Sequence, residues 1–135
     1  MANITGSAGS EALTGTANAD VISGLAGSDT ISGLDAADLI YGNAGSDLVL
    51  AGAGSDTIFG GQNADTLSGG SGFDLIYGNK SSDAISGGSA NDTIYGGASA
   101  DTVYGGTGAD SLYGNAGNDK IFATGGADTI FGGDG

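Results

Sequence analysis

Residues 87–113 read GGSANDTIYGGASADTVYGGTGADSLY, which is one nine-residue unit written three times. Each copy opens with two glycines and has an aspartate at position 6, an aliphatic residue at position 8 and a tyrosine at position 9. Outward in both directions the unit continues without insertion, giving fourteen copies over residues 6–131. Position 6 is acidic and position 8 aliphatic in all fourteen, and position 1 is glycine in twelve. Self-similarity at a fixed period predicts a repeat architecture.

Each unit predicts a turn followed by a short strand. No 3.6-residue period is present, and a glycine at nearly every ninth residue would cost a helix about 1 kcal/mol each. Positions 1–6 are therefore predicted as a turn, and positions 7–9 as a three-residue strand whose aliphatic middle side chain points inward. Aromatic residues recur at position 9 every 18 residues, so two units should complete one coil. The prediction is a single all-β solenoid over residues 1–135, with about 7.5 coils and partial units at 1–5 and 132–135.

Composition excludes several classes of function. The 135 residues include 16 acids against two lysines, for a net charge of −14, and no His or Cys. A disulfide framework and thiolate or imidazole metal sites are therefore excluded, and the charge argues against binding to nucleic acid. No apolar run is long enough for a membrane helix. A uniform ladder of carboxylates has no distinct pocket to separate two pKa values, so we predict that the chain is not an enzyme.

The column of acids points to a bound cation. Stacked coils place like charges about 4.8 Å apart along each edge, where they repel unless a cation lies between them. Glycines allow the backbone to turn sharply and to present its carbonyl oxygens. A cage of carboxylate and carbonyl oxygens suits Ca²⁺, whereas Mg²⁺ demands stricter geometry and zinc or iron prefer nitrogen or sulfur. Two edges of seven turns have at most about twelve such gaps, and full occupancy would change the charge from −14 to about +10.

These residues resemble the GGxGxDxUx nonapeptide of the RTX (repeats-in-toxin) calcium-binding family, over residues 6–135. The resemblance implies a right-handed parallel β-roll with Ca²⁺ between successive coils. It implies that the side-chain ligands are Asp20, Asp29, Asp38, Asp47, Asp56, Asp65, Asp74, Asp83, Asp92, Asp101, Asp110, Asp119 and Asp128. Backbone carbonyl ligands would come from turn residues such as Gly42, Gly45, Gly52, Gly54, Gly70, Gly72, Gly106, Gly108 and Gly117.

Departures from the family pattern make calcium binding less certain to occur in some turns than in others. Position 4, usually Gly, is occupied by another residue in six units: Asn18, Ala36, Asn63, Ser81, Ala90 and Ser99. Asn tolerates a left-handed backbone, but Ala and Ser adopt it at a cost. Glu11 has a longer side chain and lies at the end of the array, so we leave it out of the ligand set. The small core leads us to expect a largely disordered metal-free chain that folds on binding Ca²⁺.

Partners are predicted from the ends and from the faces of the coil. Neither terminus resembles a cap, and joining the tail GGDG to the head MANIT keeps the nine-residue register, so head-to-tail assembly into filaments is one expectation. The aromatic column either covers its sheet or mediates lateral association or sugar stacking: Tyr41, Phe59, Tyr77, Tyr95, Tyr113 and Phe131. A calcified rod would also attract anionic polysaccharide.

The functional prediction is a calcium-binding structural protein of a matrix, surface layer or adhesive fibre outside the cell. The alternative is a repeat module of a larger secreted toxin, protease or polysaccharide-modifying enzyme, where it would aid export and folding. The resemblance implies secretion or display at the cell surface through the bacterial type I route. We expect the chain neither to bind nucleic acid nor to insert into a membrane.

Overall fold

The computed structural model describes residues 1–135 and contains fifteen strands and no helix. The strands are β1 (Asn3–Thr5), β2 (Ala12–Thr14), β3 (Val21–Ser23), β4 (Thr30–Asp35), β5 (Leu39–Ala44), β6 (Leu48–Ala53), β7 (Thr57–Gln62), β8 (Thr66–Ser71), β9 (Leu75–Lys80), β10 (Ala84–Ser89), β11 (Thr93–Ala98), β12 (Thr102–Thr107), β13 (Ser111–Ala116), β14 (Lys120–Phe122) and β15 (Thr129–Phe131).

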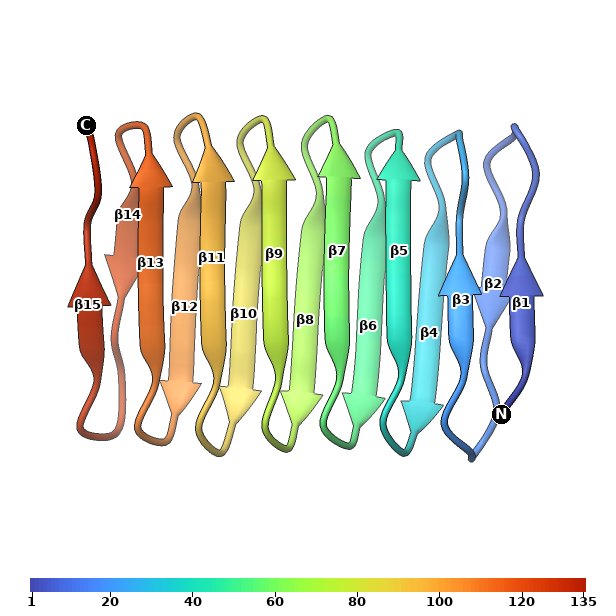
Figure 1. The fold of residues 1–135 in the computed structure, drawn as a ribbon, viewed down its shortest axis with the longest axis horizontal. Helices are drawn as coiled ribbons and strands as arrows, with labels where there is room; N and C mark the ends of the chain where they lie inside the picture. The colour runs from blue at the N-terminus through green and yellow to red at the C-terminus, as the bar shows by residue number, and fades with distance from the viewer.

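Successive strands alternate between two parallel sheets. The odd-numbered strands form an eight-stranded sheet and the even-numbered strands a seven-stranded one. Every pairing joins residues 18 apart, as in Ile40 with Ile58. Figure 1 shows the coils side by side along one long axis, with the two sheets as layers and the termini at opposite ends. The predicted parallel β-roll with two units per coil is therefore confirmed.

Strand length is where the prediction was wrong. Only the terminal strands β1–β3, β14 and β15 have three residues, whereas β4 to β13 have six and continue through position 3 of the next unit. In β5 and β7, for example, the ladder still pairs Asn43 with Gly61 beyond the predicted strand. Since the same unit lies one coil away on either side, the backbone groups of positions 1–3 also find partners there. Half of the predicted turn is thus part of the sheet.

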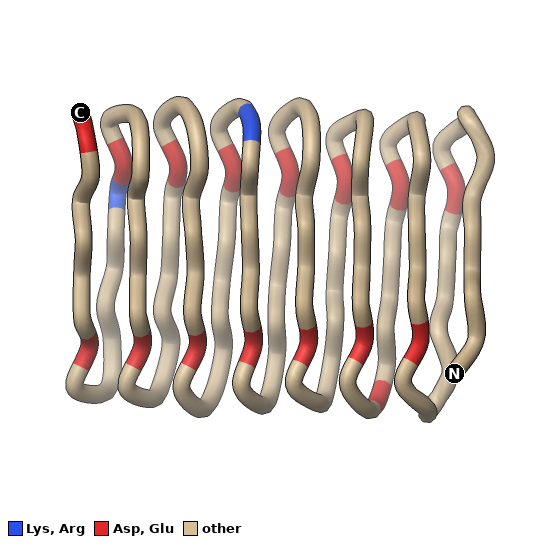
Figure 2. Tube along the Cα trace, in the orientation of Figure 1, with Lys and Arg blue, Asp and Glu red and all other residues tan.

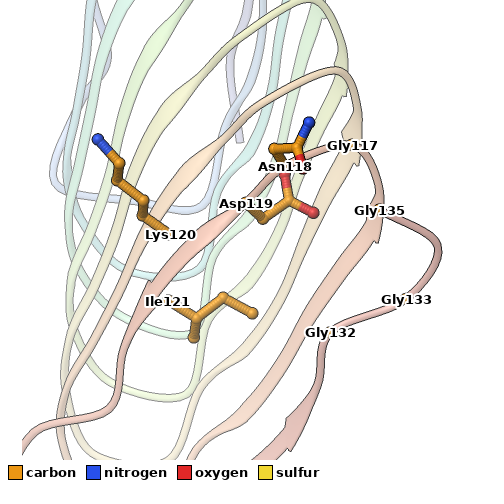
Figure 3. Close-up of a pocket in the computed structure, with 8 residues that line it drawn as sticks. All are labelled: Gly117, Asn118, Asp119, Lys120, Ile121, Gly132, Gly133 and Gly135. Atoms are coloured by element: carbon orange, nitrogen blue, oxygen red, sulfur yellow. The ribbon is translucent and has the colours of Figure 1, made fainter.

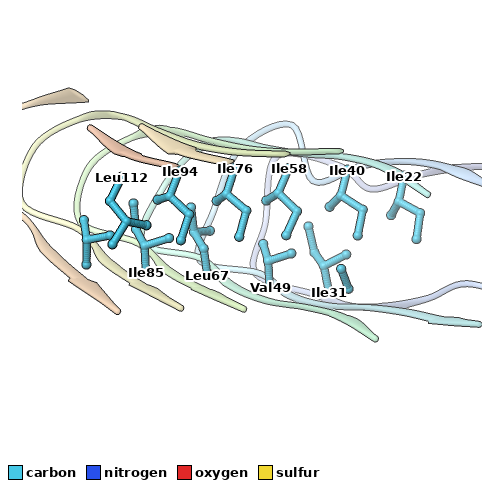
Figure 4. Close-up of a cluster of buried hydrophobic side chains, with 12 residues drawn as sticks. Ile22, Ile31, Ile40, Val49, Ile58, Leu67, Ile76, Ile85, Ile94 and Leu112 are labelled. Atoms are coloured by element: carbon cyan, nitrogen blue, oxygen red, sulfur yellow. The ribbon is translucent and has the colours of Figure 1, made fainter. Parts of the chain in front are cut away.

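The core consists of two columns of aliphatic side chains between the sheets, as predicted (Figure 4). The position-8 residues from Ile22 to Leu112 are at most 1% exposed. At the ends the columns lose a neighbouring coil, so Leu13 and Ile121 are only partly buried and Ile130 is 49% exposed. The middle coils are therefore the best-packed part of the rod.

Candidate metal sites

The position-6 acids form two columns, one along each edge of the rod (Figure 2). Each lies directly before a strand, so the sheet register fixes its position from coil to coil. The members that are no more than 3% exposed are Asp20, Asp29, Asp38, Asp47, Asp56, Asp65, Asp74, Asp83, Asp92, Asp101 and Asp110. Burial of so many carboxylates requires a compensating partner for each.

In all of these carboxylates except that of Asp20, only one oxygen has a hydrogen-bond partner. Along each column, Oδ1 accepts a hydrogen bond from the backbone N–H of the acid one coil earlier, for example Asp56 to Asp74 at 2.8 Å. The second oxygen is buried and has no hydrogen-bond partner in eleven aspartates: Asp29, Asp38, Asp47, Asp56, Asp65, Asp74, Asp83, Asp92, Asp101, Asp110 and Asp119. An unpaired buried carboxylate oxygen is costly, and these eleven are equivalent by register.

The free oxygen faces the position-1 glycine of its own unit. A Cβ placed on Gly60 would lie 2.7 Å from Asp65 Oδ2 and 2.9 Å from the carbonyl oxygen of Gly78, one coil away. Gly96 has the same surroundings, with Asp101 Oδ2 at 2.7 Å and the Gly114 carbonyl at 2.8 Å. Glycine at position 1 thus leaves space in which a carboxylate and a carbonyl of adjacent coils approach each other.

The pKa values show how unfavourable these bare carboxylates are. The pKa of Asp65, Asp74 and Asp83 is raised to about 7, mainly by burial and to a smaller extent by the charges of neighbouring aspartates, against the opposing effect of the N–H donor. The same causes raise the pKa of Asp92 and Asp101 to about 6. Near neutral pH these groups need either a proton or a cation.

The first coil differs from the others. Ser7 donates to the Glu11 carboxylate from both its N–H and its hydroxyl. Thr16 does the same for Asp20 Oδ2, at 2.7 and 2.8 Å, while Asp20 Oδ1 accepts from the Ala2 N–H. The Ser7 hydroxyl lowers the pKa of Glu11, and the Ala2 N–H lowers that of Asp20. Sequence reasoning missed these hydroxyls, although Ser7 and Thr16 stand at position 2, where most later units have Gly or Asn.

The predicted ligands are therefore not all equivalent. Asp20 has no free oxygen, and Asp128 lies near the open end, where it accepts from the Asp110 N–H at 3.0 Å. Of the predicted carbonyls, that of Gly42 lies near Asp29 Oδ2 across the space at Gly24. A Cβ placed on the glycine one coil further on would lie 1.4–2.1 Å from the carbonyl oxygens of Gly52, Gly54, Gly70, Gly108 and Gly117. Their part in metal binding stays a prediction.

Two turn positions require a left-handed backbone. At position 4, φ is 73–88° for Ala36, Asn63, Ser81, Ala90 and Ser99, as the departures from glycine implied. Sequence reasoning missed the same requirement at position 2, which Ser7, Thr16 and Thr124 do not share. The non-glycine residues there with a left-handed backbone have φ of 74–84°: Leu25, Leu34, Asn43, Asn79 and Asn115. The signal was the recurrence of Asn at this position every 36 residues, because Asn tolerates this region.

One pocket, of about 360 Å³, marks the open C-terminal end of the rod. Asn118, Asp119, Lys120 and Ile121 line it with glycines of the last two turns (Figure 3). Because β14 and β15 each pair on one side only, this is where a further coil would lie. No group of three or more acidic side chains converges anywhere in the structure, so an ion in the turns would need backbone carbonyls among its ligands.

Comparison with known families agrees with this geometry. The model of the RTX calcium-binding nonapeptide repeat (4 copies) matches residues 5–40, 25–58, 32–67, 41–76, 59–94, 77–112 and 104–135. The chain belongs to the RTX calcium-binding nonapeptide repeat family. The RTX β-roll is a structural calcium-binding fold, and its repeats are typical of secreted bacterial proteins. No curated protein matches the chain. The RTX rod contains no helix able to span a membrane.

Proposed function

We propose that this chain is an extracellular structural rod whose folding depends on Ca²⁺ bound between adjacent turns. The observation that carries the proposal is the set of eleven buried Oδ2 atoms without a hydrogen-bond partner. A calcium ion takes six to eight oxygen ligands from carboxylates, carbonyls and water. The free carboxylate oxygens and the position-1 carbonyls of adjacent coils supply part of such a set.

Calcium fits these turns better than other ions. Each turn presents oxygen only, which disfavours zinc and iron. The supporting carbonyls belong to a flexible glycine-rich backbone and come from two coils, so they suit an ion that tolerates irregular coordination. We propose Asp29 to Asp119, at every ninth residue, as the side chains that contribute, which fits the expectation of up to about twelve ions.

A calcium titration tests this function. The far-UV circular dichroism of the metal-free chain should be that of a coil, should become β-like in millimolar CaCl₂ and should revert with excess chelator. Isothermal titration calorimetry on the same sample should give several ions per chain, with Mg²⁺ as the matched control that fails to fold it. A β-like spectrum that persists in excess chelator at pH 7.5 would contradict the proposal.

Head-to-tail assembly is part of the proposal. β1 and β2 at one end, and β14 and β15 at the other, each have one unpaired edge, which supports pairing with another rod. Negative-stain microscopy in calcium should show filaments longer than a single rod. A strictly monomeric species would contradict head-to-tail assembly and leave the proposal of calcium-dependent folding intact.

Export as a module of a larger toxin, protease or polysaccharide-modifying enzyme is the second candidate. Membership of the RTX family supports it, because these repeats are typical of secreted bacterial proteins. Recovery of the calcium-free chain outside cells that carry a type I exporter would support secretion by that route.

An anionic polysaccharide is a further proposed partner of the calcium-loaded rod. Retention of the chain on an anionic polysaccharide column only in calcium would support this partner.

A further inference from the structure

The outward face of the eight-stranded sheet carries a straight ridge of aromatic rings. Six rings at position 9 stack on one another, with centroids 4.6–5.2 Å apart and planes within 13°. They are Tyr41, Phe59, Tyr77, Tyr95, Tyr113 and Phe131. The ridge therefore runs along the rod axis, across β5 to β15, for about 24 Å.

Smaller side chains flank this ridge on both sides. Position 7 alternates Leu39, Thr57, Leu75 and Thr93 along one side, and position 2 supplies mainly Asn and Gly along the other. None of these three columns contains a charged residue from β3 to β15. The acids lie at the two edges of the rod, so the middle of this face is an uncharged strip (Figure 2).

The opposite sheet lacks such a strip. Its position-9 column contains Ser32, Ser68 and Ser86, and only Tyr104 and Phe122 stack there, at 4.7 Å. Lys120 adds a charge at the last strand. The aromatic ridge is thus a property of one face and not a consequence of the repeat itself.

The stacking also limits what the ridge contacts. The inner rings turn both faces toward neighbouring rings, so a sugar ring or a planar ligand has little free ring face on which to stack. The ring edges, the tyrosine hydroxyls and the mixed apolar and hydroxyl side chains at position 7 remain for contact with a partner. Such a surface is complementary to another ridge of the same kind, as in the interdigitated sheets of steric zippers.

We propose that this face binds a second copy of the chain, so that two calcium-loaded rods pair sheet to sheet. The proposal rests on the proposed function, because the ridge exists only in the folded rod. Because the carboxylate columns lie along the edges of the rod, two rods meet at this face without bringing those columns together. The two rods are related by a twofold axis parallel to their length, so they run in the same direction. Their ridges then lie side by side, and each ridge packs over the position-7 column of the other rod.

The contact area sets the strength of this dimer. A strip about 24 Å long and three side chains wide amounts to roughly 400 Å² per partner, which is below the size of a standard stable interface. The dimer should therefore form reversibly and at high concentration. Its closed symmetry distinguishes it from head-to-tail assembly, which has no upper size.

Sedimentation equilibrium in calcium tests the proposal. As concentration rises, the mass should double relative to that of the unpaired assembly, which is 12.7 kDa for a single rod or a multiple of it where rods also join head to tail. The double variant Tyr77→Lys, Tyr95→Lys should weaken dimerisation at least tenfold, because it places like charges across the interface. The matched control is Ser68→Lys, Ser86→Lys, at the same strand position on the other sheet, and it should dimerise like the parent.

Circular dichroism of each sample separates this test from that of the proposed function. A sample that folds in calcium but remains monomeric at millimolar concentration would overturn the pairing and leave calcium-dependent folding intact. Equal losses in the two lysine variants would overturn the choice of face. The chain lacks cysteine, so Ser23→Cys with a short bismaleimide reports orientation. Parallel rods bring the two copies of residue 23 together, and failure to cross-link would overturn the parallel arrangement.

Discussion

The first coil and the middle coils use the same nonapeptide but satisfy its acid in different ways. In the first coil, hydroxyls of Ser7 and Thr16 donate to the carboxylates of Glu11 and Asp20. In the middle coils, position 2 is mostly Gly or Asn in a left-handed conformation, and a carboxylate oxygen such as Asp74 Oδ2 has no partner. The acid is thus satisfied within the chain in the first coil, whereas in the middle coils one of its oxygens is left free for an ion.

The pKa values quantify this difference. The pKa of Asp20 lies below its ordinary value of 3.8, whereas burial raises that of Asp74 to about 7. The first coil should therefore tolerate the absence of metal, while the middle of the rod should not. Calcium dependence is then a property of the best-packed coils and not of the exposed ends.

The largest expected effect is that of pH on the metal-free chain. The folded pKa of Asp65, Asp74 and Asp83 is about 7, above the ordinary 3.8, so the folded state binds more protons. The stability they contribute is complete below pH 3.8 and is lost as pH rises through 7. In chelated buffer, lowering the pH from 8 to 5 should increase the β-like circular dichroism, at a pH still above the sequence pI of about 4.1.

Excess calcium is the control for this experiment. With the turns occupied, the spectrum should change little between pH 8 and 6, because the carboxylates no longer require protons. A metal-free chain whose β signal decreases on acidification would contradict the raised pKa values.

Removal of one carboxylate should act in opposite directions with and without metal. Asp74→Asn removes a buried charge, so the metal-free chain should be more stable at pH 8, while calcium affinity should fall about tenfold or more. Asp20→Asn, in the first coil, should lower calcium affinity less than twofold, because both oxygens of Asp20 are already hydrogen-bonded. Calorimetry on the two variants makes the comparison, and equal losses of affinity would contradict it.

A methyl group at position 1 should also act on one turn. Gly60→Ala places Cβ 2.7 Å from Asp65 Oδ2 and should weaken calcium binding at that turn by a few-fold. Ala51 already carries this methyl group beside the turn of Asp56, so Ala51→Gly should strengthen binding there. Calcium-dependent melting temperatures that move in the same direction in both variants would contradict the role of the space at position 1.

The smallest expected effect concerns backbone strain. Leu34 has a φ of 84°, which costs a non-glycine residue about 1–2 kcal/mol, and Asn adopts this region more readily. Leu34→Asn should therefore stabilise the calcium-loaded rod by up to about 1 kcal/mol in urea unfolding. Leu50→Asn is the control, since Leu50 is similarly exposed but has no left-handed backbone. Equal changes in the two variants would contradict the assignment of strain.

The sequence predicted those features that repeat without variation. The inward aliphatics from Ile22 to Leu112 and the 18-residue register follow from periods of nine and 18 residues, because each side chain has the same neighbours in every coil. The two columns of acids follow in the same way. The six-residue strands did not, because hydrogen bonding of positions 1–3 depends on the neighbouring coil and not on local preference for strand.

Features specific to single units required the structure. The hydrogen bonds of Ser7 and Thr16 depend on the direction of one hydroxyl, which a substitution at position 2 does not reveal. The positive φ of Leu25 and Leu34 contradicts the preference of leucine and is imposed by the stacked coils. Sequence reasoning did note the departures from glycine at position 4. Because glycine occupies that position in most units, it correctly predicted a left-handed backbone at Ala36 and Ala90.

The most direct test of the free carboxylates as calcium ligands is carboxyl ¹³C NMR of the chain labelled at Asp and Glu, followed through a calcium titration. We expect the side-chain resonances of aspartates in the middle coils, such as Asp65, Asp74 and Asp83, to shift as calcium binds. Those of Glu11 and Asp20 should shift little, because their oxygens already accept hydrogen bonds. Unchanged resonances in the middle coils of the folded, calcium-loaded rod would contradict the account.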